Sequence, residues 1–450
     1  MGATVRGITL GRYSDSVDAK DDEVTLLDNK KIYLGTGNDL QLSHDGSNSI
    51  INDNGTGTLK LQSGGSDKLE VLSTGVKITG DVQATSLNDG SISGDRNFLL
   101  NGECLIAQRG TQFTAQSAAA YHLDRWKTHA FNVDSGRYQV DQIADAPDGF
   151  KKSLKYSCTT ANGSQNTNEQ LYVQQQIEAQ NINWLKYFHA SPDTVTLSFH
   201  VKSNNTGTFG AALKLTDNNS AENSGDTRNY EFQYTISSAD TWEKKTISIT
   251  LDSDTSQAKS TGANVGMAVQ FWLSAGTNRD GVTSLLTWGG NGNATSGVDN
   301  KTFFSSTANN FFITGIQLEV GPVGTSYHHK TYEEELAKCY RYYYRLELDD
   351  PYAYLTNIGV NSATISYGGV IFPVKLRAVN ATFTHHSTYS DWQLYESGTA
   401  RTPSDIGSGS RTGKQSSELR IDSTSMTAGS GGWVRANNNT NCWVAWDAEI

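Results

Sequence analysis

Residues 311–347 read FFITGIQLEVGPVGTSYHHKTYEEELAKCYRYYYRLE, and the two halves of this stretch predict different structures. Positions 311–320 are rich in apolar and β-branched residues, and the last of them alternate between apolar and polar, which predicts a strand. Gly321 and Pro322 then end it. Thr331 and Glu334 have the spacing of a capping box, and apolar residues recur behind them at helical intervals, which predicts a helix over 331–346.

The composition excludes several classes of protein. Charged residues make up 18% of the 450 residues, against about 25% in an average globular chain, and the 43 glycines point to many turns. The net charge is −11 and no basic run exceeds two residues, so we expect no nucleic acid partner. No stretch approaches the ~20 apolar residues of a membrane span, so we expect no membrane insertion. The four cysteines lie far apart without CxxC spacing, which indicates neither a zinc ribbon nor a disulfide framework.

Between residues 24 and 82 a short strand and a turn alternate about every ten residues. Turn signals such as Asn54-Gly55 and Gly64-Gly65 separate the strands. This spacing is that of a β repeat. The seven predicted strands are 24–27, 31–34, 39–42, 49–51, 58–61, 68–72 and 76–79.

Each of these strands carries few apolar side chains. Burial at about 25 cal/mol per Å² must offset about 1–2 kcal/mol of backbone ordering per residue, and strands this short cannot achieve that alone. Other copies of the chain must therefore supply the missing core. We predict a threefold stalk in which three chains wrap their strands around one axis.

Two larger β regions follow a linker at 83–97. The first suits a jelly roll over 97–326 and the second a smaller sandwich over 352–450, in which the Gly/Ser-rich segment 397–417 is predicted to be a mobile loop. The strands predicted for the jelly roll are 98–100, 138–140, 154–157, 171–177, 194–201, 208–215, 230–236, 246–251, 266–273 and 311–320. Those predicted for the smaller sandwich are 353–360, 362–366, 370–375, 382–385, 392–395, 418–421, 433–436 and 441–448.

Several short motifs occur in a definite order along residues 97–450. They are NGEC (101–104), QRG (108–110), YHLDRW (121–126), GIQLEVG (315–321), TYEEELAKCYRYYYR (331–345), FPVKLRA (372–378) and DAEI (447–450). In this order they resemble motifs of the tail fibre and receptor-binding proteins of tailed bacteriophages. The segment 34–63 is also similar to a repeat of phage fibre shafts. The resemblance implies a jelly roll similar to carbohydrate-binding modules, closed before the helix and followed by a distal domain.

The sequence carries none of the common catalytic motifs that we sought, which are GxSxG, HExxH, the P-loop and a GxGxxG that opens a helix. The pairs His328-His329 and His385-His386 are poor metal sites, because adjacent residues of a strand face opposite ways. A pair of carboxylates suited to glycan hydrolysis would occur by chance among 47 acidic residues, so the sequence neither predicts nor excludes one. We predict no catalytic residue, no metal and no cofactor, and expect that the chain is not an enzyme.

Sugar binding needs an aromatic face for the apolar side of a pyranose, with amides or carboxylates for its hydroxyls. In the distal region the predicted glycan-binding residues are Tyr389, Asp391, Trp392, Tyr395 and Trp433. In the jelly roll, Trp242 and the stretch WGGNG (288–292) are an alternative set. Other aromatic residues have structural interpretations: Trp126, Trp443 and Trp446 are predicted to be core, and the tyrosines within 340–344 to pack or anchor the helix.

The predicted fold class is all-β, with a trimeric intertwined β stalk, a jelly-roll β-sandwich, one connecting α-helix and a C-terminal β-sandwich. The expected boundaries are 1–23 for a virion-docking or flexible segment, 24–96 for the stalk and linker, 97–330 for the jelly roll, 331–347 for the helix and 348–450 for the distal receptor-binding sandwich.

Together these features predict a homotrimeric phage tail fibre, made in the host cytoplasm and located in the virion tail. It would bind a host surface polysaccharide or lipopolysaccharide through non-catalytic, multivalent contacts, and other phage tail proteins through its N-terminus. Two alternatives stay open. One is a tailspike depolymerase that cleaves capsule or lipopolysaccharide, and the other is a purely structural fibre or decoration protein.

Overall fold

Strands dominate the protein in a computed structural model that describes residues 4–5, 8–9, 17–20, 23–26, 28–73, 75–79, 96–133, 137–216, 227–280, 285–290 and 303–450. Within these residues there are two α-helices, α1 (Ala179–Ile182) and α2 (Tyr332–Tyr340). The all-β prediction is confirmed. The chain forms two compact units, Met1–Thr85 and Ser86–Ile450.

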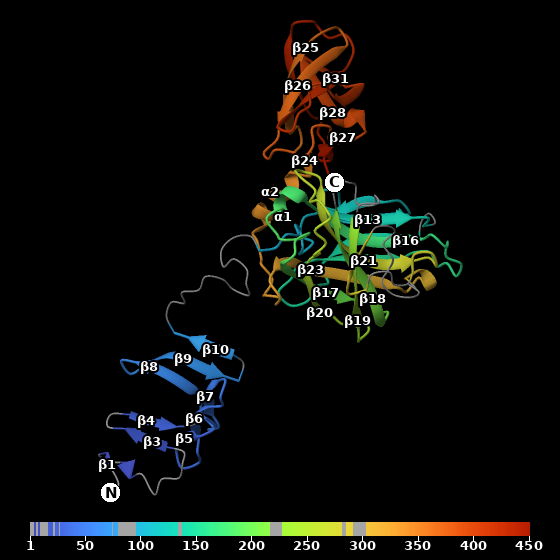
Figure 1. The fold of residues 1–450 in the computed structure, drawn as a ribbon. Coiled ribbons are helices and arrows are strands. Elements are labelled where there is room, and N and C mark those ends of the chain that lie inside the picture. Colours follow the sequence, from blue (N-terminus) through green and yellow to red (C-terminus); the bar gives the residue numbers. More distant parts are fainter. Residues whose placement is uncertain are drawn as a thin grey trace. The chain divides into compact units, whose positions relative to one another are not determined.

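The first unit consists of short antiparallel strands, shown in blue in Figure 1. β1 pairs with β2 and β3 with β4, while β5 to β7 and β8 to β10 form two three-stranded sheets. The structure contains all seven predicted strands within two residues of their predicted bounds, and three further short strands before them. The strands are β1 (Thr4–Val5), β2 (Ile8–Thr9), β3 (Val17–Lys20), β4 (Glu23–Leu26), β5 (Lys31–Leu34), β6 (Leu40–His44), β7 (Ser49–Asp53), β8 (Leu59–Ser63), β9 (Ser66–Leu72) and β10 (Gly75–Ile78).

In the part of the first unit whose side chains the structure describes, residues 28–73 and 75–79, apolar side chains are largely exposed in the single chain. Ile51, Leu61 and Val76 are 56%, 54% and 59% exposed. Within the described part of 28–79, no residue at all is buried. The described part of this unit therefore gains little hydrophobic stabilisation within one chain. Large exposed apolar patches of this kind mark interaction surfaces.

Two antiparallel sheets form the jelly roll (Figure 1). Their strand orders are β11-β14-β15-β23-β17-β20 and β12-β13-β16-β21-β18-β19-β22. Nine of the ten predicted strands are present; residues 98–100 instead form an irregular segment, and β11, β12, β13 and β22 have no counterpart in the prediction. The strands are β11 (Gln112–Gln116), β12 (Ala120–Leu123), β13 (Trp126–Phe131), β14 (Tyr138–Ile143), β15 (Ser153–Cys158), β16 (Gln170–Glu178), β17 (Thr194–Lys202), β18 (Gly207–Thr216), β19 (Thr227–Ile236), β20 (Glu243–Thr250), β21 (Val265–Ala275), β22 (Trp288–Gly290) and β23 (Asn310–Val320).

The core of the jelly roll lies between its two sheets. Phe199 of β17 and Phe271 of β21 come from opposite sheets and meet edge to face, with ring centroids 4.8 Å apart. Trp126 is 1% exposed, as its core assignment predicts, and its indole N–H donates to the Asn101 carbonyl at 2.8 Å. Strand alternation therefore directs one face of each sheet inward.

The helix after the jelly roll is shorter than predicted. The capping box of Thr331 and Glu334 is present, but α2 ends at Tyr340 instead of continuing to 346. The chain then continues as β24 (Tyr343–Leu348), which pairs with β33 (Cys442–Asp447). Pairing with a strand far along the chain outweighs the local helical spacing, since tertiary contacts override propensity. Cys339 on this helix is fully buried, and burial raises its pKa well above the usual value, in keeping with a small core residue.

The distal sandwich has a three-stranded sheet, β24-β33-β27, and a seven-stranded sheet, β29-β28-β32-β25-β26-β31-β30. The two predicted strands 362–366 and 370–375 are one strand, β26, because pairing with β31 continues through Gly368 and Gly369. The segment 397–417, predicted to be a mobile loop, contains β29 and β30. The strands after β24 are β25 (Tyr354–Val360), β26 (Ile365–Ile371), β27 (Thr382–His385), β28 (Trp392–Glu396), β29 (Thr399–Arg401), β30 (Asp405–Ser408), β31 (Ser416–Asp422), β32 (Gly431–Ala436) and β33 (Cys442–Asp447).

Aromatic rings fill the distal core. Trp446 is fully buried and lies 6.0 Å from the ring of Tyr344 in a stacked arrangement. The predicted core role is therefore confirmed for Trp446 but not for Trp443, which faces the other side of β33, half-buried, with the Arg345 guanidinium 4.4 Å from its ring centroid. Tyr344 belongs to the distal core and Tyr343 packs under Arg109 of the jelly roll at 3.7 Å, so these tyrosines anchor the connecting segment.

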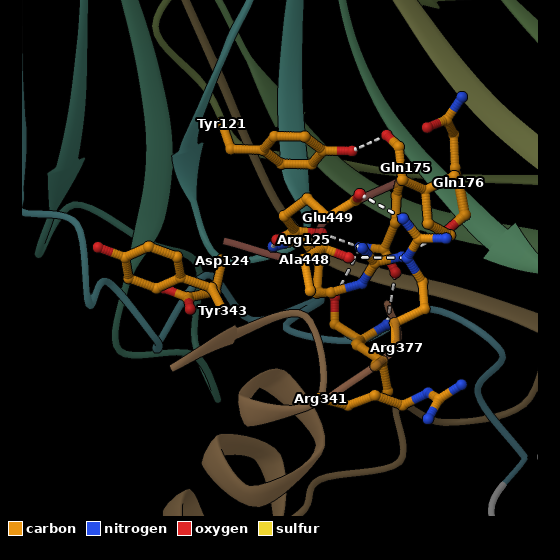
Figure 2. Close-up of polar contacts among 12 residues, drawn as sticks. Tyr121, Asp124, Arg125, Gln175, Gln176, Arg341, Tyr343, Arg377, Ala448 and Glu449 are labelled. Carbon is orange, nitrogen blue, oxygen red and sulfur yellow. Dashed lines mark hydrogen bonds and ion pairs between the residues drawn. The ribbon is translucent and has the colours of Figure 1, made fainter. Parts of the chain in front are cut away.

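Charged side chains join the two sandwiches within the second unit (Figure 2). Arg125 of the jelly roll pairs with Glu449, and Arg109 contacts Asp447 at 3.0 Å. Arg377 donates to the carbonyl oxygens of Ala448 and Glu449, each at 2.7 Å. The end of the last strand is thus fixed from both sides, which sets the orientation of the distal sandwich on the jelly roll.

Candidate functional site

Three of the five predicted glycan-binding residues are committed to contacts within the distal sandwich. Trp392 is fully buried, and its indole N–H donates to the His386 carbonyl at 2.9 Å. The hydroxyl of Tyr389 donates to Asp405 at 3.0 Å, and the carboxylate of Asp391 contacts the His386 ring nitrogen at 2.7 Å. Trp392 is therefore a core residue instead of an exposed one, because alternation along β28 turns it inward.

The other two predicted residues face outward and touch each other. Tyr395 on β28 lies directly opposite Trp433 on β32. Their rings stack with centroids 4.7 Å apart and an angle of 20° between planes. Both side chains are half-buried, so part of each ring remains open. Cross-strand aromatic pairs of this kind stabilise a sheet and also present a flat apolar surface.

The sheet register places an amide and a strip of glycines beside this aromatic pair. Asn357 of β25 lies opposite Trp433, and Gly359 of the same strand lies opposite Gly431. A Cβ atom added to Gly359 would meet no heavy atom within 4 Å, and one added to Gly431 would come no closer than 3.9 Å to Ile358. Glycine weakens a strand interior, and it often marks a place where another molecule approaches the backbone.

A second aromatic residue bounds the glycine strip. Tyr367 of β26 lies opposite Gly359 and also opposite Arg420 of β31. Two hydrogen bonds of 2.8 Å to Asp422 hold the Arg420 guanidinium in place. Because strands lie about 4.8 Å apart, Tyr367 and Trp433 flank β25 at a lateral separation of about 10 Å. We call this surface the distal platform; its members are Asn357, Gly359, Tyr367, Tyr395, Arg420, Gly431 and Trp433.

The distal platform suits a flat ligand with one apolar side and polar edges. Tyr395 and Trp433 offer ring faces, the bare strip gives room for a ring to lie against the backbone, and Asn357 and Arg420 are exposed hydrogen-bonding groups. Pyranose rings have this character, with axial hydrogens on one face and hydroxyls around the rim. The distal platform depends on the register between strands, and patterns within single strands of the sequence predicted only two of its three aromatic members, Tyr395 and Trp433.

The outer face of the seven-stranded jelly-roll sheet also carries a row of aromatic side chains, but these rings are covered by their surroundings. His129, Tyr172 and Trp272 form a row with ring centroids 4.5 and 4.6 Å apart. Tyr172 and Trp272 are only 2% and 0% exposed. A ligand could reach these rings only after rearrangement of their surroundings, so the face is a poorer candidate than the distal platform.

The tryptophans of the alternative set in the jelly roll, Trp242 and Trp288, also make hydrogen bonds within the protein. The Trp242 indole N–H donates to Asp145 at 3.0 Å, and that of Trp288 donates to the Thr250 carbonyl at 2.8 Å. Residues 291 and 292 of the WGGNG stretch lie outside the described residues.

The histidine and cysteine side chains described below do not form a metal site. His329 contacts Glu103 at 2.8 Å, and all four cysteines are buried and unpaired with one another. Among the residues that the structure describes, no cluster of three or more His, Cys, Asp or Glu side chains could hold a metal ion. The helices in the described ranges are all too short or too polar to cross a membrane.

Comparison with known proteins gives similarities of structure at low sequence identity. No family model matches the sequence, and no curated protein matches it. A solved structure of the enzymatically active domain of bacteriophage CBA120 tailspike protein 4 is similar over 50% of this chain and 21% of that one, with 12% identity and a TM-score of 0.27. The chain thus spans about a fifth of the length of that tailspike domain.

Two carbohydrate-binding modules are similar at the same level. The family 11 module of Clostridium thermocellum, solved with a mixed-linked tetrasaccharide, has 10% identity and a TM-score of 0.24 over 48% of this chain and 98% of that one. The xylan-binding CBM22-1 domain of Paenibacillus barcinonensis Xyn10C has 11% identity and a TM-score of 0.22 over 47% of this chain and 94% of that one.

Proposed function

We propose that this chain is a homotrimeric tail fibre protein of a phage, which attaches the virion to a host surface polysaccharide or lipopolysaccharide without cleaving it. The observation that carries the proposal is the stacked Tyr395–Trp433 pair beside the open strip at Gly359 and Gly431. Exposed aromatic faces next to bare backbone give a surface on which a sugar ring can lie flat. As part of this proposal, the protein belongs to the virion tail.

The distal platform is shallow, so each contact with a glycan is weak and attachment depends on several contacts at once. The exposed apolar side chains of the first unit, including Ile51 at 56% and Val76 at 59%, support self-association of that unit. A trimer would carry three platforms, and linked sites raise avidity over that of a single site without any new contact. Residues 1–23 are the segment that we assign to docking on other tail proteins.

Binding of the full-length protein to a panel of purified bacterial lipopolysaccharides and capsular polysaccharides tests the proposal. We expect binding to a subset of the panel, weakened about tenfold or more by Trp433→Ala, since aromatic anchors dominate such contacts. Phe131→Ala is the matched control, because Phe131 is an aromatic residue of the jelly roll that is 49% exposed. Equal binding by wild type and Trp433→Ala would refute the platform.

The same incubation separates attachment from catalysis. Reducing ends are assayed over time in the polysaccharide that the protein binds. A constant level supports a binding protein, whereas a progressive rise would replace the proposal with a depolymerase. Loss of trimer mass, with binding retained, would remove only the avidity part of the proposal.

A further inference from the structure

A cavity of about 670 Å³ opens where the jelly roll, helix α2 and the distal sandwich meet. The jelly roll contributes Phe98 and Trp184, α2 contributes Lys338 and Arg341, and the distal sandwich contributes Val374. Its polar lining includes Arg125, Gln175, Gln176 and Arg341, which are labelled in Figure 2. The volume falls within the ~300–1,000 Å³ typical of small-ligand sites. We call this cavity the junction pocket.

One wall of the junction pocket is an exposed indole. Trp184 follows α1 and is 64% exposed, although Ile182, two positions before it, and Leu185, directly after it, are fully buried and fix the backbone. Its ring lies 6.0 Å from that of Phe98, tilted by 48°. An exposed tryptophan on an anchored turn contributes little to the core, and it presents a large, rigid apolar face.

The polar part of the lining is held in place. The Arg341 guanidinium makes two hydrogen bonds of 2.7 Å to Glu178, which is fully buried. Burial raises the pKa of Glu178, but the hydrogen bonds from Arg341 and Tyr342, together with the charges of Arg341 and Arg125, outweigh it, so this pKa lies below its usual value. The pair is therefore charged and leaves the Nη1 group of Arg341 outside it. Arg125, which lines the same pocket, stacks on Tyr342 at 3.5 Å and pairs with Glu449.

The lining of the junction pocket thus combines hydrogen-bond donors with an exposed indole ring. Asn181, exposed on α1, adds an amide that can both donate and accept. Because Glu178 and Glu449 neutralise Arg341 and Arg125, the pocket offers directed donors with little excess charge. Preorganised donors in the same cavity as a flat apolar face suit a ring that carries hydroxyl groups.

We propose that the junction pocket is a second saccharide-binding site, which holds one pyranose residue with its apolar face on Trp184 and its hydroxyls toward Asn181, Lys338 and Arg341. The ligand class rests on the proposed function, but the site is separate from the distal platform. A glycan-binding fibre with one site on each sandwich could engage two places on a surface polysaccharide, which adds to the avidity of the trimer.

The test uses the full-length protein and saturation-transfer NMR with the methyl glycosides of glucose, galactose, N-acetylglucosamine and glucuronic acid. The Trp433→Ala variant, which lacks the platform anchor, should retain a signal from at least one sugar. Adding Trp184→Ala should reduce that signal about tenfold, and adding Asn181→Ala instead should reduce it about threefold, as expected for one aromatic contact and one hydrogen bond. Phe131→Ala in the same background should leave it unchanged.

Three outcomes would overturn the proposal. If Trp433→Ala abolishes every signal seen with wild type, the platform alone binds sugar, and the proposed function survives without the junction pocket. If Trp184→Ala leaves the signal of the Trp433→Ala variant unchanged, the remaining site lies elsewhere. If Trp184→Ala lowers the mass of the oligomer in light scattering, the pocket holds a neighbouring chain instead of a sugar.

Discussion

Arg125 and Glu449 form an ion pair in which both side chains are almost fully buried, at 2% and 3% exposure. They lie 324 positions apart in the sequence. The backbone N–H of Arg125 also donates to Glu449 at 3.1 Å, and the guanidinium lies 3.5 Å from the Tyr342 ring centroid. One side chain of the jelly roll thus fixes both the last strand and the start of the distal sandwich, which explains why residues from both sandwiches form one compact unit.

Removing one partner of this pair leaves a buried charge uncompensated. Glu449→Gln should therefore lower the free energy of unfolding by about 3–5 kcal/mol. Arg411→Ala is the control, because the Arg411 side chain is 85% exposed and its 3.4 Å pair with Glu418 should be worth no more than about 1 kcal/mol. Urea denaturation of both variants measures the difference. Similar midpoints for the two would show that the Arg125–Glu449 pair does not couple the sandwiches.

Substitution of Trp392 should lower stability, whereas substitution of Trp433 should weaken glycan binding. Trp392→Ala empties a fully buried position and should cost about 3–5 kcal/mol of stability. Trp433→Ala removes a half-exposed ring and should change stability by less than about 1 kcal/mol while it weakens glycan binding. Thermal unfolding together with polysaccharide binding distinguishes them. A large loss of stability in Trp433→Ala would assign that residue a packing role.

Gly359 and Gly368 provide a matched pair of glycines on adjacent strands. A side chain at Gly359 meets nothing within 4 Å, so Gly359→Val should keep or raise the melting temperature, since valine favours strands. At Gly368 a Cβ atom would lie 2.7 Å from both the Asn357 carbonyl oxygen and Thr356, so Gly368→Val should be strongly destabilising. Equal losses in melting temperature would contradict the open strip.

The distal sandwich should lose stability in acid through Glu396. Hydrogen bonds from Ser430 and Ser397 lower the pKa of Glu396 from 4.5 to about 2, and Arg401 contacts the same carboxylate at 3.3 Å. A carboxylate whose pKa is lowered by folding stabilises the folded state when the pH is above the pKa of the unfolded state. That contribution disappears as the pH drops from about 4.5 toward about 2.

The variant Glu396→Gln should remove this part of the acid dependence. At pH 7 it should melt below wild type, and the gap should narrow as the pH approaches 2. Melting curves at pH 7, 4 and 3 provide the measurement. A constant gap across that range would mean that Glu396 is not the group that titrates.

Substitutions at Ile51 and Asn52, adjacent residues of β7 in the first unit, test whether three chains share one core there. Ile51 is 56% exposed in the single chain, where Ile51→Asp should be nearly neutral. In an intertwined trimer the same change would bury a charge and should reduce the oligomer mass in light scattering. Asn52→Asp, on the opposite side of the strand, should leave the mass unchanged. Unaltered mass in both variants would argue against packing of chains through β7.

Local patterns were sufficient to predict seven strands of the first unit, β4 to β10, because turn residues such as Asn54-Gly55 separate them, but not the three short strands before them. They failed for Tyr343 and Tyr344, which continue the helical spacing of α2 but pair with Asp447 and Trp446. They also failed for 397–417, where β29 and β30 add to sheet edges that only tertiary structure supplies.

The candidate site was predictable only in part for a similar reason. Tyr395 and Trp433 are aromatic residues in short strands, so the sequence suggests them, but it also suggested Trp392, whose inward direction follows from its neighbours in the sheet. Asn357 and Gly359 enter the platform through a register that shifts between Tyr354 and Thr356. Irregularities of this kind in strand pairing cannot be read from one strand alone.

The most direct test of the central claim is the affinity of full-length wild type and Gly359→Val for the bound members of the polysaccharide panel. Valine at this position fills the strip between Trp433 and Tyr367 without removing any hydrogen bond or aromatic ring. The distal platform predicts a loss of about tenfold or more in affinity at an unchanged melting temperature. Undiminished binding by Gly359→Val would contradict it.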